Sequence, residues 1–565
     1  MAARRLRAWI RVCGLWSMMN TAGTAGQNAP VPPRSQNDFV QTQEFKIAGT
    51  VVNAVTGALL ERVRVSIANT RAPNQRTEMV TGAGGHFEFT GVPDGKYSLE
   101  GTRRGYLTSF YEQHEQYSTA IVTGPEFATD KLVLRLMPMG VISGHVLDES
   151  GEPARNAQVQ LFLENHSAGM SRVMAVTRGS STDDRGSFDF AVLEPGRYFV
   201  SVNATPWYSV HPVRAQDGDG SARGVSPALD VAYPTTYYGG GTESDSAVPI
   251  DLEGGEKQEI EIRLRPVPAL RLIVRVPVDA SGESPDQANV FRFPVLRKRV
   301  FDSVEPVNPG QVQTLAPGVV ELTGVAAGRY DVRIQSSNPE EVPHFSEIDL
   351  QRDGQDLNAA QGETLAKLTV RLEGEEALPK QYAVALRNER QRIVELVQGN
   401  ASKQVSFPAV EPGKYVIVVM APGKNYAVTR TTSGAGATAG HEVNVLSGAS
   451  MEVTARLVEG VVGIEGVVEK SGKPMAGVMV ALVPKDPDRN LELFRRDQSD
   501  FDGTFLLRGV APGTYTIVAV EDAWGFEWLK TGVLARYAQH GQQVIIGDNM
   551  RGTVHLPEAV EVQAK

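Results

Sequence analysis

One short motif, repeated five times along the chain, most constrains what this sequence can fold into. Each copy has an aromatic residue or leucine, then valine or leucine three residues later, and then glycine, any residue and tyrosine at the end. Successive tyrosines lie roughly one hundred residues apart, which suits a small β-sandwich domain and is longer than the repeat of a solenoid. The sequence therefore predicts a row of similar compact units. The glycine and tyrosine of the five copies are Gly95 and Tyr97, Gly196 and Tyr198, Gly328 and Tyr330, Gly413 and Tyr415, and Gly513 and Tyr515.

The motif predicts a turn between two β-strands. Proline precedes the glycine in the second, fourth and fifth copies. A Pro-Gly step suits the central positions of a type II turn, where proline fixes φ and glycine accepts a positive φ. After the turn, apolar and polar residues alternate, most clearly from Tyr330 to Ile334, as in a strand with one buried face. We expect each tyrosine ring to lie in a core and its hydroxyl to hydrogen-bond across a Greek-key corner.

Two further patterns frame the motif. Upstream, polar residues and glycine precede a phenylalanine in residues 81–87, 182–188 and 499–505, which predicts hairpin turns. The carboxylates of these turns, Asp183 and Asp184 in one copy and Asp500 and Asp502 in another, are typical of turn formation before glycine. Downstream, an alternating strand is expected to close each unit, at residues 132–136, 260–264, 368–372, 453–457 and 553–556.

The first strands of the units resemble a known domain family. The stretch from Ile142 to Val146, followed by Gly151-Glu-Pro153, the glycine-phenylalanine turn and Pro-Gly-x-Tyr, resembles the carboxypeptidase regulatory-like domain. Ile464 and Ile47 begin similar stretches in the fifth and first units, whereas the third and fourth units are degenerate. The resemblance implies a transthyretin-like (prealbumin-like) β-sandwich, a fold grouped with carbohydrate-binding-like modules. In bacteria, large exported proteins carry such domains in tandem.

These patterns together predict an all-β protein built from five tandem Greek-key β-sandwich domains of the transthyretin-like or immunoglobulin-like kind. Glycine and proline are abundant, with 56 and 33 residues, which fits many turns between short strands. Three of the domains carry the family resemblance and two are expected to be degenerate. The expected bounds are 45–138, 139–266 and 460–565 for the former, and 267–373 and 374–459 for the latter.

The N-terminus is typical of an export signal. Arg4, Arg5 and Arg7 precede a mostly apolar stretch over residues 8–19, and small residues follow up to residue 26. We expect a signal peptide over residues 1–26 and a linker over 27–44, which makes the protein periplasmic, cell-surface or extracellular. The alternatives are a disordered tail or a misplaced start codon. The single cysteine, Cys13, lies in this stretch, so no intrachain disulfide can form.

Composition and motifs argue against several functions. A net charge of −10 disfavours nucleic acid as a partner, and no apolar run reaches the roughly 18 residues that span a bilayer. His344 and Glu347 have the His-x-x-Glu spacing of zinc carboxypeptidases, but we expect them in a loop that enters a strand, with no catalytic domain around them. Asp217 and Asp219 lack the other ligands of a calcium loop. We expect no catalytic residue, metal or cofactor.

Two aromatic-rich loops remain as candidate binding sites. The loop in the second unit holds Trp207, Tyr208, Tyr233, Tyr237 and Tyr238, and the loop in the fifth unit holds Trp524, Phe526, Trp528 and Tyr537. Aromatic rings on loops can stack on the faces of sugars or contact another protein. The alternative is that these rings pack as a small satellite core beneath long loops.

The sequence thus predicts a non-catalytic exported protein that binds carbohydrate through its aromatic loops, at or outside the cell surface. One alternative is a structural or protein-interaction spacer array, which would require sizeable contacts between units. A second alternative is an accessory or regulatory module of a peptidase system. The expected partner is a polysaccharide or another envelope protein.

Overall fold

The computed structural model describes residues 44–166, 169–176, 179–212, 226–278, 291–338, 341–374, 378–433, 436–438, 441–530 and 532–565. Among the described residues, strands make up 56% and helices 3%, so the protein is all-β, as predicted. The described helices are single turns, namely η1 (Ser244–Ser246), η3 (Ala359–Gln361), η4 (Leu491–Leu493), η5 (Ala523–Gly525) and α1 (Ala535–Ala538). The predicted signal peptide with Cys13, nearly all of the predicted linker and the Asp217–Asp219 loop lie outside the described residues.

The strands group into five stretches of chain, which we call segments 1 to 5 (residues 45–138, 139–266, 267–365, 366–459 and 460–565). In segment 1 one sheet has the order β4-β1-β8, and the other has the order β3-β2-β5-β6 with β7 also paired to β5. Its strands are β1 (Phe45–Asn53), β2 (Arg64–Asn69), β3 (Arg76–Val80), β4 (His86–Val92), β5 (Gly95–Thr102), β6 (Ser109–Phe110), β7 (Ile121–Thr123) and β8 (Leu132–Leu136).

Segment 2 repeats this arrangement with a larger second sheet. Its sheets have the orders β13-β9-β18 and β11-β10-β14-β16, with β12 and β17 at the side of the latter. Its strands are β9 (Gly140–Leu147), β10 (Gln158–Asn165), β11 (Arg172–Ala175), β12 (Ser180–Ser181), β13 (Ser187–Leu193), β14 (Gly196–Asn203), β15 (Val231–Ala232), β16 (Thr236–Tyr237), β17 (Ile250–Leu252) and β18 (Lys257–Arg263).

Segment 3 also has two sheets, of orders β23-β24-β20-β27 and β22-β21-β25-β26-β28. A short strand at its start, β19, pairs with β15 of segment 2. The strands are β19 (Val267–Pro268), β20 (Leu270–Arg275), β21 (Arg292–Val300), β22 (Ser303–Val307), β23 (Gln311–Ala316), β24 (Val319–Val325), β25 (Gly328–Ser336), β26 (His344–Leu350), β27 (Gln355–Asn358) and β28 (Glu363–Thr364).

In segments 4 and 5 the strands connect into one nine-stranded sheet each, wrapped around a core. Segment 4 holds β29 (Ala366–Glu373), β30 (Ala383–Asn388), β31 (Ile393–Gln398), β32 (Gln404–Val410), β33 (Gly413–Ala421), β34 (Lys424–Ser433), β35 (Gly436–Thr438), β36 (Glu442–Val445) and β37 (Ser450–Glu459). Segment 5 holds β38 (Val462–Lys470), β39 (Lys473–Pro474), β40 (Met479–Pro484), β41 (Arg495–Gln498), β42 (Thr504–Val510), β43 (Gly513–Val520), β44 (Gln542–Ile546), β45 (Gly552–His555) and β46 (Val560–Gln563).

The same pairing rule recurs in every segment. The opening strand lies between an antiparallel partner and a late parallel partner, as when β1 pairs with β4 and with β8. The parallel pairs in the other segments are β9 with β18, β20 with β27, β29 with β37, and β38 with β45. Because the two ends of each segment meet in one sheet, each segment encloses its own hydrophobic core.

One predicted closing strand belongs elsewhere. The alternating stretch 368–372, expected to end the unit over residues 267–373, lies in β29. Leu368 and Leu372 are buried in the core of segment 4, and β29 pairs with β32 and β37 of that segment. The expected boundary between residues 373 and 374 is therefore wrong, because the sequence alternation of an opening strand equals that of a closing strand. Segment 3 instead uses β27 as the parallel partner of its opening strand.

The glycine-rich turns upstream of the motif are not hairpin turns. The turn at residues 81–85 joins β3, which pairs with β2, to β4, which pairs with β1 in the opposite sheet. The equivalent turns in segments 2 and 5 likewise follow β12 and β41 and lead into β13 and β42. These turns therefore cross over the core, and their glycines allow the close approach: a Cβ on Gly85 would lie 2.8 Å from the Val51 carbonyl oxygen.

The five motif tyrosines are corner residues, as predicted. All five rings are buried, with exposed fractions of 7% or less. Each hydroxyl donates to the carbonyl oxygen four residues earlier, at Pro93, Glu194, Ala326, Glu411 and Ala511, over 2.7 to 3.1 Å. The predicted type II turn is wrong, however, because Gly413 begins its strand with φ of 155° and neither Gly196 nor Gly513 has a positive φ.

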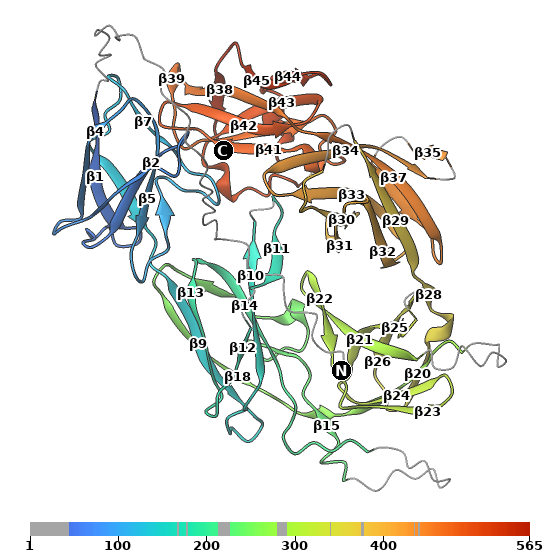
Figure 1. The fold of residues 1–565 in the computed structure, drawn as a ribbon. Coiled ribbons are helices and arrows are strands. Elements are labelled where there is room, and N and C mark those ends of the chain that lie inside the picture. The colour runs from blue at the N-terminus through green and yellow to red at the C-terminus, as the bar shows by residue number, and fades with distance from the viewer. Residues whose placement is uncertain are drawn as a thin grey trace, which may run out of the picture.

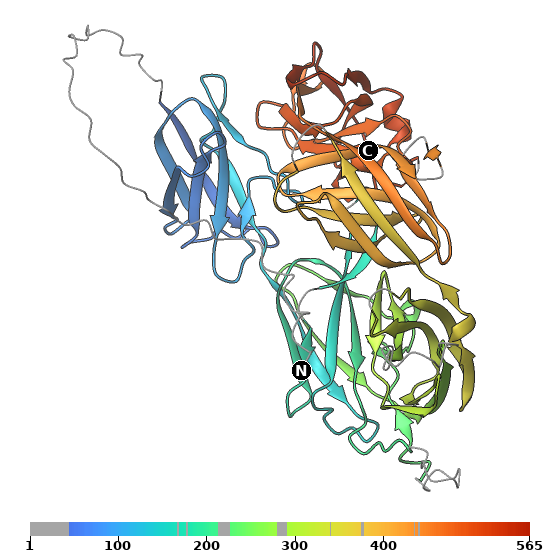
Figure 2. The same ribbon diagram turned by 45° about the vertical axis from the view of Figure 1, so that its right-hand side comes forward.

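The chain doubles back so that its first and last segments lie side by side (Figures 1 and 2). Segments 2 and 3 meet through a small cluster of Phe162, Tyr237 and Val300. Segments 4 and 5 share an ion pair between Arg387 and Glu492, and Arg333 of segment 3 contacts segment 4. The five segments therefore form a closed arrangement and not an extended string.

Candidate functional site

The aromatic loop of segment 2 follows β14, at the end of the sandwich. Trp207 is the most exposed large apolar side chain described, at 83%, and its ring meets that of Tyr208 edge to face at 5.7 Å. Burial of an indole ring is strongly favourable. A tryptophan that stays this exposed beside polar groups therefore marks a candidate contact surface. Among the described residues, none covers most of the Trp207 ring, which makes this side chain a candidate ligand contact.

Glu149 fixes two of the predicted tyrosines. The hydroxyls of Tyr208 and Tyr233 both donate to its carboxylate, the latter over 2.5 Å. Although desolvation opposes ionisation of Glu149, these two hydrogen bonds lower the pKa of its carboxyl. The hydrogen bond to Glu149 raises the pKa of Tyr208 to about 12. Glu149 was not singled out from the sequence, because only the fold brings β9 and its following turn next to this loop.

A cleft of about 1240 Å³ lies between segments 2 and 3 beside Trp207 and Tyr233. Polar side chains that could bind hydroxyl groups line the cleft on both walls, from segment 2 and from segment 3. They comprise the amides of Asn156, Gln158, Asn203 and Asn308 and the carboxylates of Asp148, Glu152, Asp184 and Glu305. Burial raises the pKa of the Glu305 carboxyl. The arrangement of one exposed ring, one fixed ring and many amides and carboxylates can hold a polar ligand with apolar faces.

Tyr237 and Tyr238 are structural. Tyr237 has no exposed surface, and its ring packs on Phe301 of segment 3 with centroids 5.6 Å apart. Tyr238 is half-buried against the core of segment 2. These two rings therefore belong to the packing between and within segments, in agreement with the alternative expected from the sequence.

The aromatic loop of segment 5 is also occupied by packing. Tyr537 is buried, and Phe526 lies against it with centroids 5.9 Å apart. Trp528 packs on Phe494, and the Arg496 guanidinium lies 4.4 Å from the Trp528 ring centroid. The loop thus forms a second apolar layer on the outside of the β40–β43 sheet.

Trp524 reaches across to segment 1. Its ring stacks on His114 with centroids 4.9 Å apart and planes 5° from parallel, while its indole N–H donates to the Gly477 carbonyl at 3.2 Å. His114 also contacts Gln498 through Nδ1 at 3.1 Å. The predicted ligand-binding ring is therefore part of an interface inside the molecule.

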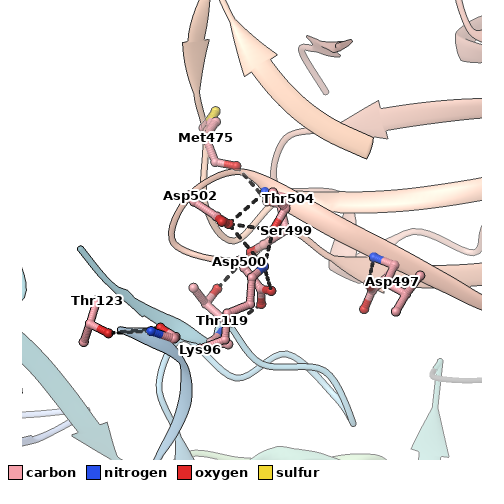
Figure 3. Close-up of polar contacts among 12 residues, drawn as sticks. Lys96, Thr119, Thr123, Met475, Asp497, Ser499, Asp500, Asp502 and Thr504 are labelled. Atoms are coloured by element: carbon pink, nitrogen blue, oxygen red, sulfur yellow. Dashed lines mark hydrogen bonds and ion pairs between the residues drawn. The ribbon is translucent and has the colours of Figure 1, made fainter. Parts of the chain in front are cut away.

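The turn before β42 carries the polar centre of this interface (Figure 3). Lys96 Nζ of segment 1 lies 2.6 Å from Asp500 Oδ2 and 3.4 Å from Asp502 Oδ1, and it also hydrogen-bonds Thr504. Asp500 Oδ1 accepts from the Ala120 backbone N–H at 3.0 Å. Burial raises the pKa of Asp500, an effect that the Lys96 ammonium opposes. The carboxylates interpreted as turn formers thus also hold segment 1.

Apolar and backbone contacts surround this ion pair. The Phe501 backbone N–H donates to the Ala120 carbonyl at 3.0 Å, and its ring packs against the core of segment 1. Arg496 Nη2 lies 2.7 Å from Glu115 Oε2, with the Arg496 side chain 4% exposed. No sequence signal reveals these partners, because they are almost four hundred residues apart.

The His-x-x-Glu pattern has no metal-binding geometry. His344 begins β26, so His344 and Glu347, three residues apart on a strand, lie on opposite faces. Within the described residues, no group of three or more His, Cys, Asp or Glu side chains could hold a metal ion. The described part of the chain also contains no helix long and apolar enough to cross a membrane.

Comparison with known families bears on the first two segments. Residues 46–120 and 141–229 match the model of the carboxypeptidase regulatory-like domain. These two stretches of the chain are therefore similar to carboxypeptidase regulatory-like domains. The matches lie in segments 1 and 2, where the sequence resemblance to this family was strong. Of the two, the domain in segment 2 provides Trp207, and the domain in segment 1 provides Lys96.

Solved structures similar to this chain include three bacterial proteins. The Bacillus anthracis TIE protein is 12% identical, over 75% of this chain and 76% of that chain, with a TM-score of 0.18. A streptococcal ancillary pilin is 11% identical, over 56% and 98%, with a TM-score of 0.20. A minor pilin of Streptococcus agalactiae is 12% identical, over 42% and 99%, with a TM-score of 0.19. No curated protein matches the sequence.

Proposed function

We propose that this is an exported, non-catalytic protein of five β-sandwich domains that binds carbohydrate in the cleft between segments 2 and 3. The observation that carries the proposal is Trp207, 83% exposed at the end of a sandwich and beside a cleft of about 1240 Å³. The proposed domains are the five segments, with the boundary between the third and fourth at residues 365 and 366.

The chemistry of the cleft suits a sugar. A pyranose ring offers a C–H face that packs on an aromatic ring, while its hydroxyls need donors and acceptors around the edge. Trp207 supplies the free ring face, and Tyr233 is held in place by Glu149. Asn203 and Asn156 supply amide groups that can both donate and accept. Glu305 supplies an acceptor on the opposite wall, in segment 3.

The test compares Trp207→Ala with a matched control. Phe291, 67% exposed on segment 3, does not line the cleft, so Phe291→Ala removes an exposed ring elsewhere. Purified protein beginning at residue 27 is run by affinity electrophoresis through gels containing neutral or acidic polysaccharides. We expect at least one polysaccharide to retard the protein, Trp207→Ala to weaken the retardation at least tenfold, and Phe291→Ala to leave it unchanged. Retention unaffected by Trp207→Ala, or no retention by any polysaccharide, would overturn the proposal.

A second candidate function, a rigid scaffold for protein interaction, is favoured by the contact between segments 1 and 5. A spacer array needs units held at fixed positions, and Lys96, Asp500 and Trp524 supply an ion pair and a ring stack between distant segments. Small-angle scattering tests this candidate. A maximum dimension close to that of the closed arrangement supports it, whereas an extended and variable shape in solution argues against it.

A further inference from the structure

Two arginines lie directly opposite each other on adjacent strands of segment 4. Arg430 of β34 and Arg456 of β37 are partners in the antiparallel register, and both are exposed. Like charges at opposed positions of a sheet repel and destabilise the strand pair. Neither arginine forms an ion pair or side-chain hydrogen bond within the described residues. Glu373 of β29, the other register neighbour of Arg456, also makes no ion pair there.

The two arginines line a cleft of about 640 Å³ between segments 4 and 5. Two further cations lie in its lining, Lys403 of segment 4 and Arg551 of segment 5. The lining has fewer carboxylates than cations. Glu459 forms an ion pair with Lys424 at 2.8 Å, so Glu373 and Asp548 are the other carboxylates near the arginines. The cleft is therefore locally positive in a chain whose net charge is −10.

Part of the cleft lining is apolar. Its apolar residues are Leu378, Leu457, Val461 and Pro512. Apolar walls exclude water and so strengthen an electrostatic interaction relative to the open surface. An oxyanion in this cleft would offer the two guanidinium groups a shared partner, and guanidinium groups bind carboxylate and phosphate oxygens in pairs.

We propose that the cleft between segments 4 and 5 is an oxyanion-binding site, whose ligand is a carboxylate or phosphate group carried by a polymer or free in solution. Arg430 and Arg456 are the binding residues, and Lys403 and Arg551 add positive charge from the two walls. The ligand removes the repulsion between the two arginines, so its binding also stabilises segment 4. This site is separate from the cleft beside Trp207, and its test does not depend on that cleft.

The experiment measures thermal unfolding and binding at low ionic strength with inorganic phosphate, polygalacturonate or neutral dextran. We expect phosphate and polygalacturonate, but not dextran, to raise the unfolding midpoint of the wild-type protein, with affinity falling as salt is added. Arg456→Gln and Arg430→Gln should each weaken binding at least tenfold without lowering the midpoint in the absence of ligand. Phosphate binding without polygalacturonate binding indicates a free anion as the ligand, and tighter polygalacturonate binding indicates a polymer.

Two controls keep the result specific. Arg371→Gln removes an exposed arginine from β29 of the same sheet, outside the cleft, and should leave binding within twofold of wild type. Trp207→Ala should also retain phosphate binding. An equal loss in Arg371→Gln would indicate a non-specific charge effect and overturn the proposal.

Discussion

Lys96 of segment 1 and Asp500 of segment 5 form an ion pair of 2.6 Å although 404 residues separate them in the chain. The pair lies in an interface that also contains the Phe501 ring and the stacked rings of Trp524 and His114. Since contacts between such distant residues form only after both segments have folded, this interface is expected to close last. It is also expected to open before any single sandwich unfolds.

Replacement of Lys96 by methionine should loosen segment 1 without unfolding it. The variant leaves the Asp500 carboxylate, 21% exposed, with the Ala120 backbone N–H but without its cation. Loss of a partner by a mostly buried polar group costs about 1–3 kcal/mol. Hydrogen exchange should therefore accelerate at residues 118–123, while exchange in β1 stays slow. Lys46→Met is the control, because Lys46 and Glu88 form an exposed pair, and such pairs contribute about 0–1 kcal/mol. Equal effects of the two variants would show that the Lys96 contact does not hold the interface.

Stability should fall with rising pH through the titration of Asp497. Burial raises the pKa of this carboxyl to about 6 from 3.8. A carboxyl with a raised pKa in the folded state contributes stability that is complete below about pH 4 and is lost as the pH rises through about 6. Asp497→Asn cannot ionise and keeps an acceptor for the Leu506 N–H. The free energy of unfolding of this variant, relative to that of the wild-type protein, should therefore increase by about 3 kcal/mol between pH 4 and pH 7.

Urea unfolding at several pH values measures this difference in stability. For Asp183→Asn we expect a pH dependence of the opposite sign. Backbone hydrogen bonds from Ser187 and Arg185 lower the pKa of Asp183, whose turn in segment 2 corresponds to the Asp500 turn of segment 5. That group contributes stability above its ordinary pKa and loses it as the pH falls. Asp183→Asn should therefore be less stable than the wild-type protein at pH 7 and similar to it in acid. A pH-independent difference for Asp497→Asn would contradict the prediction.

Two tyrosines of segment 2 should respond in opposite directions to the loss of a hydroxyl. The Tyr237 hydroxyl is buried and has no hydrogen-bond partner in the part of the chain that the structure describes. Tyr237→Phe should raise stability by about 1 kcal/mol, because it removes an unsatisfied polar group. The Tyr198 hydroxyl donates to the Glu194 carbonyl at 2.8 Å, so Tyr198→Phe should lower stability by about 1 kcal/mol. Thermal unfolding midpoints of the two variants measure the contrast, and a fall in both would contradict it.

The elements that depend on local pattern could be predicted from the sequence. The strands and the buried tyrosine corners could be predicted from the alternation after Tyr330 and from the repeated glycine and tyrosine. Both features involve residues within a few positions of one another. What the sequence could not distinguish was the sheet to which a strand belongs. The residues over 368–372 and the turns before β4, β13 and β42 have the same local pattern in either arrangement.

The candidate site was predictable only in part for the same reason. Trp207 and Trp524 are equivalent as sequence features, since both are tryptophans in polar, glycine-containing loops. The fold separates them, because His114 of a distant segment covers Trp524 and no described residue covers Trp207 to the same extent. Likewise, Asp500 has the sequence of a turn former, and its second role appears only when Lys96 is adjacent.

The left-handed residue of the repeated motif lies before the Pro-Gly step and not at its glycine. Gly91, Gly324 and Gly509, each two residues after the first motif residue, have φ between 64° and 73°, beside an irregularity in the strand pairing. In segment 2 the same position is Val192, with φ of 65° and a side chain 54% exposed. A left-handed backbone conformation costs a non-glycine residue about 1–2 kcal/mol. Glycine avoids this cost, but its larger conformational entropy in the unfolded chain offsets part of the gain in stability. Val192→Gly should therefore stabilise segment 2 by roughly 0.5–1 kcal/mol, whereas Gly91→Val should destabilise segment 1. Thermal unfolding of the two variants measures both signs, and a loss of stability in Val192→Gly would mean that the valine side chain contributes more through packing than its backbone strain costs.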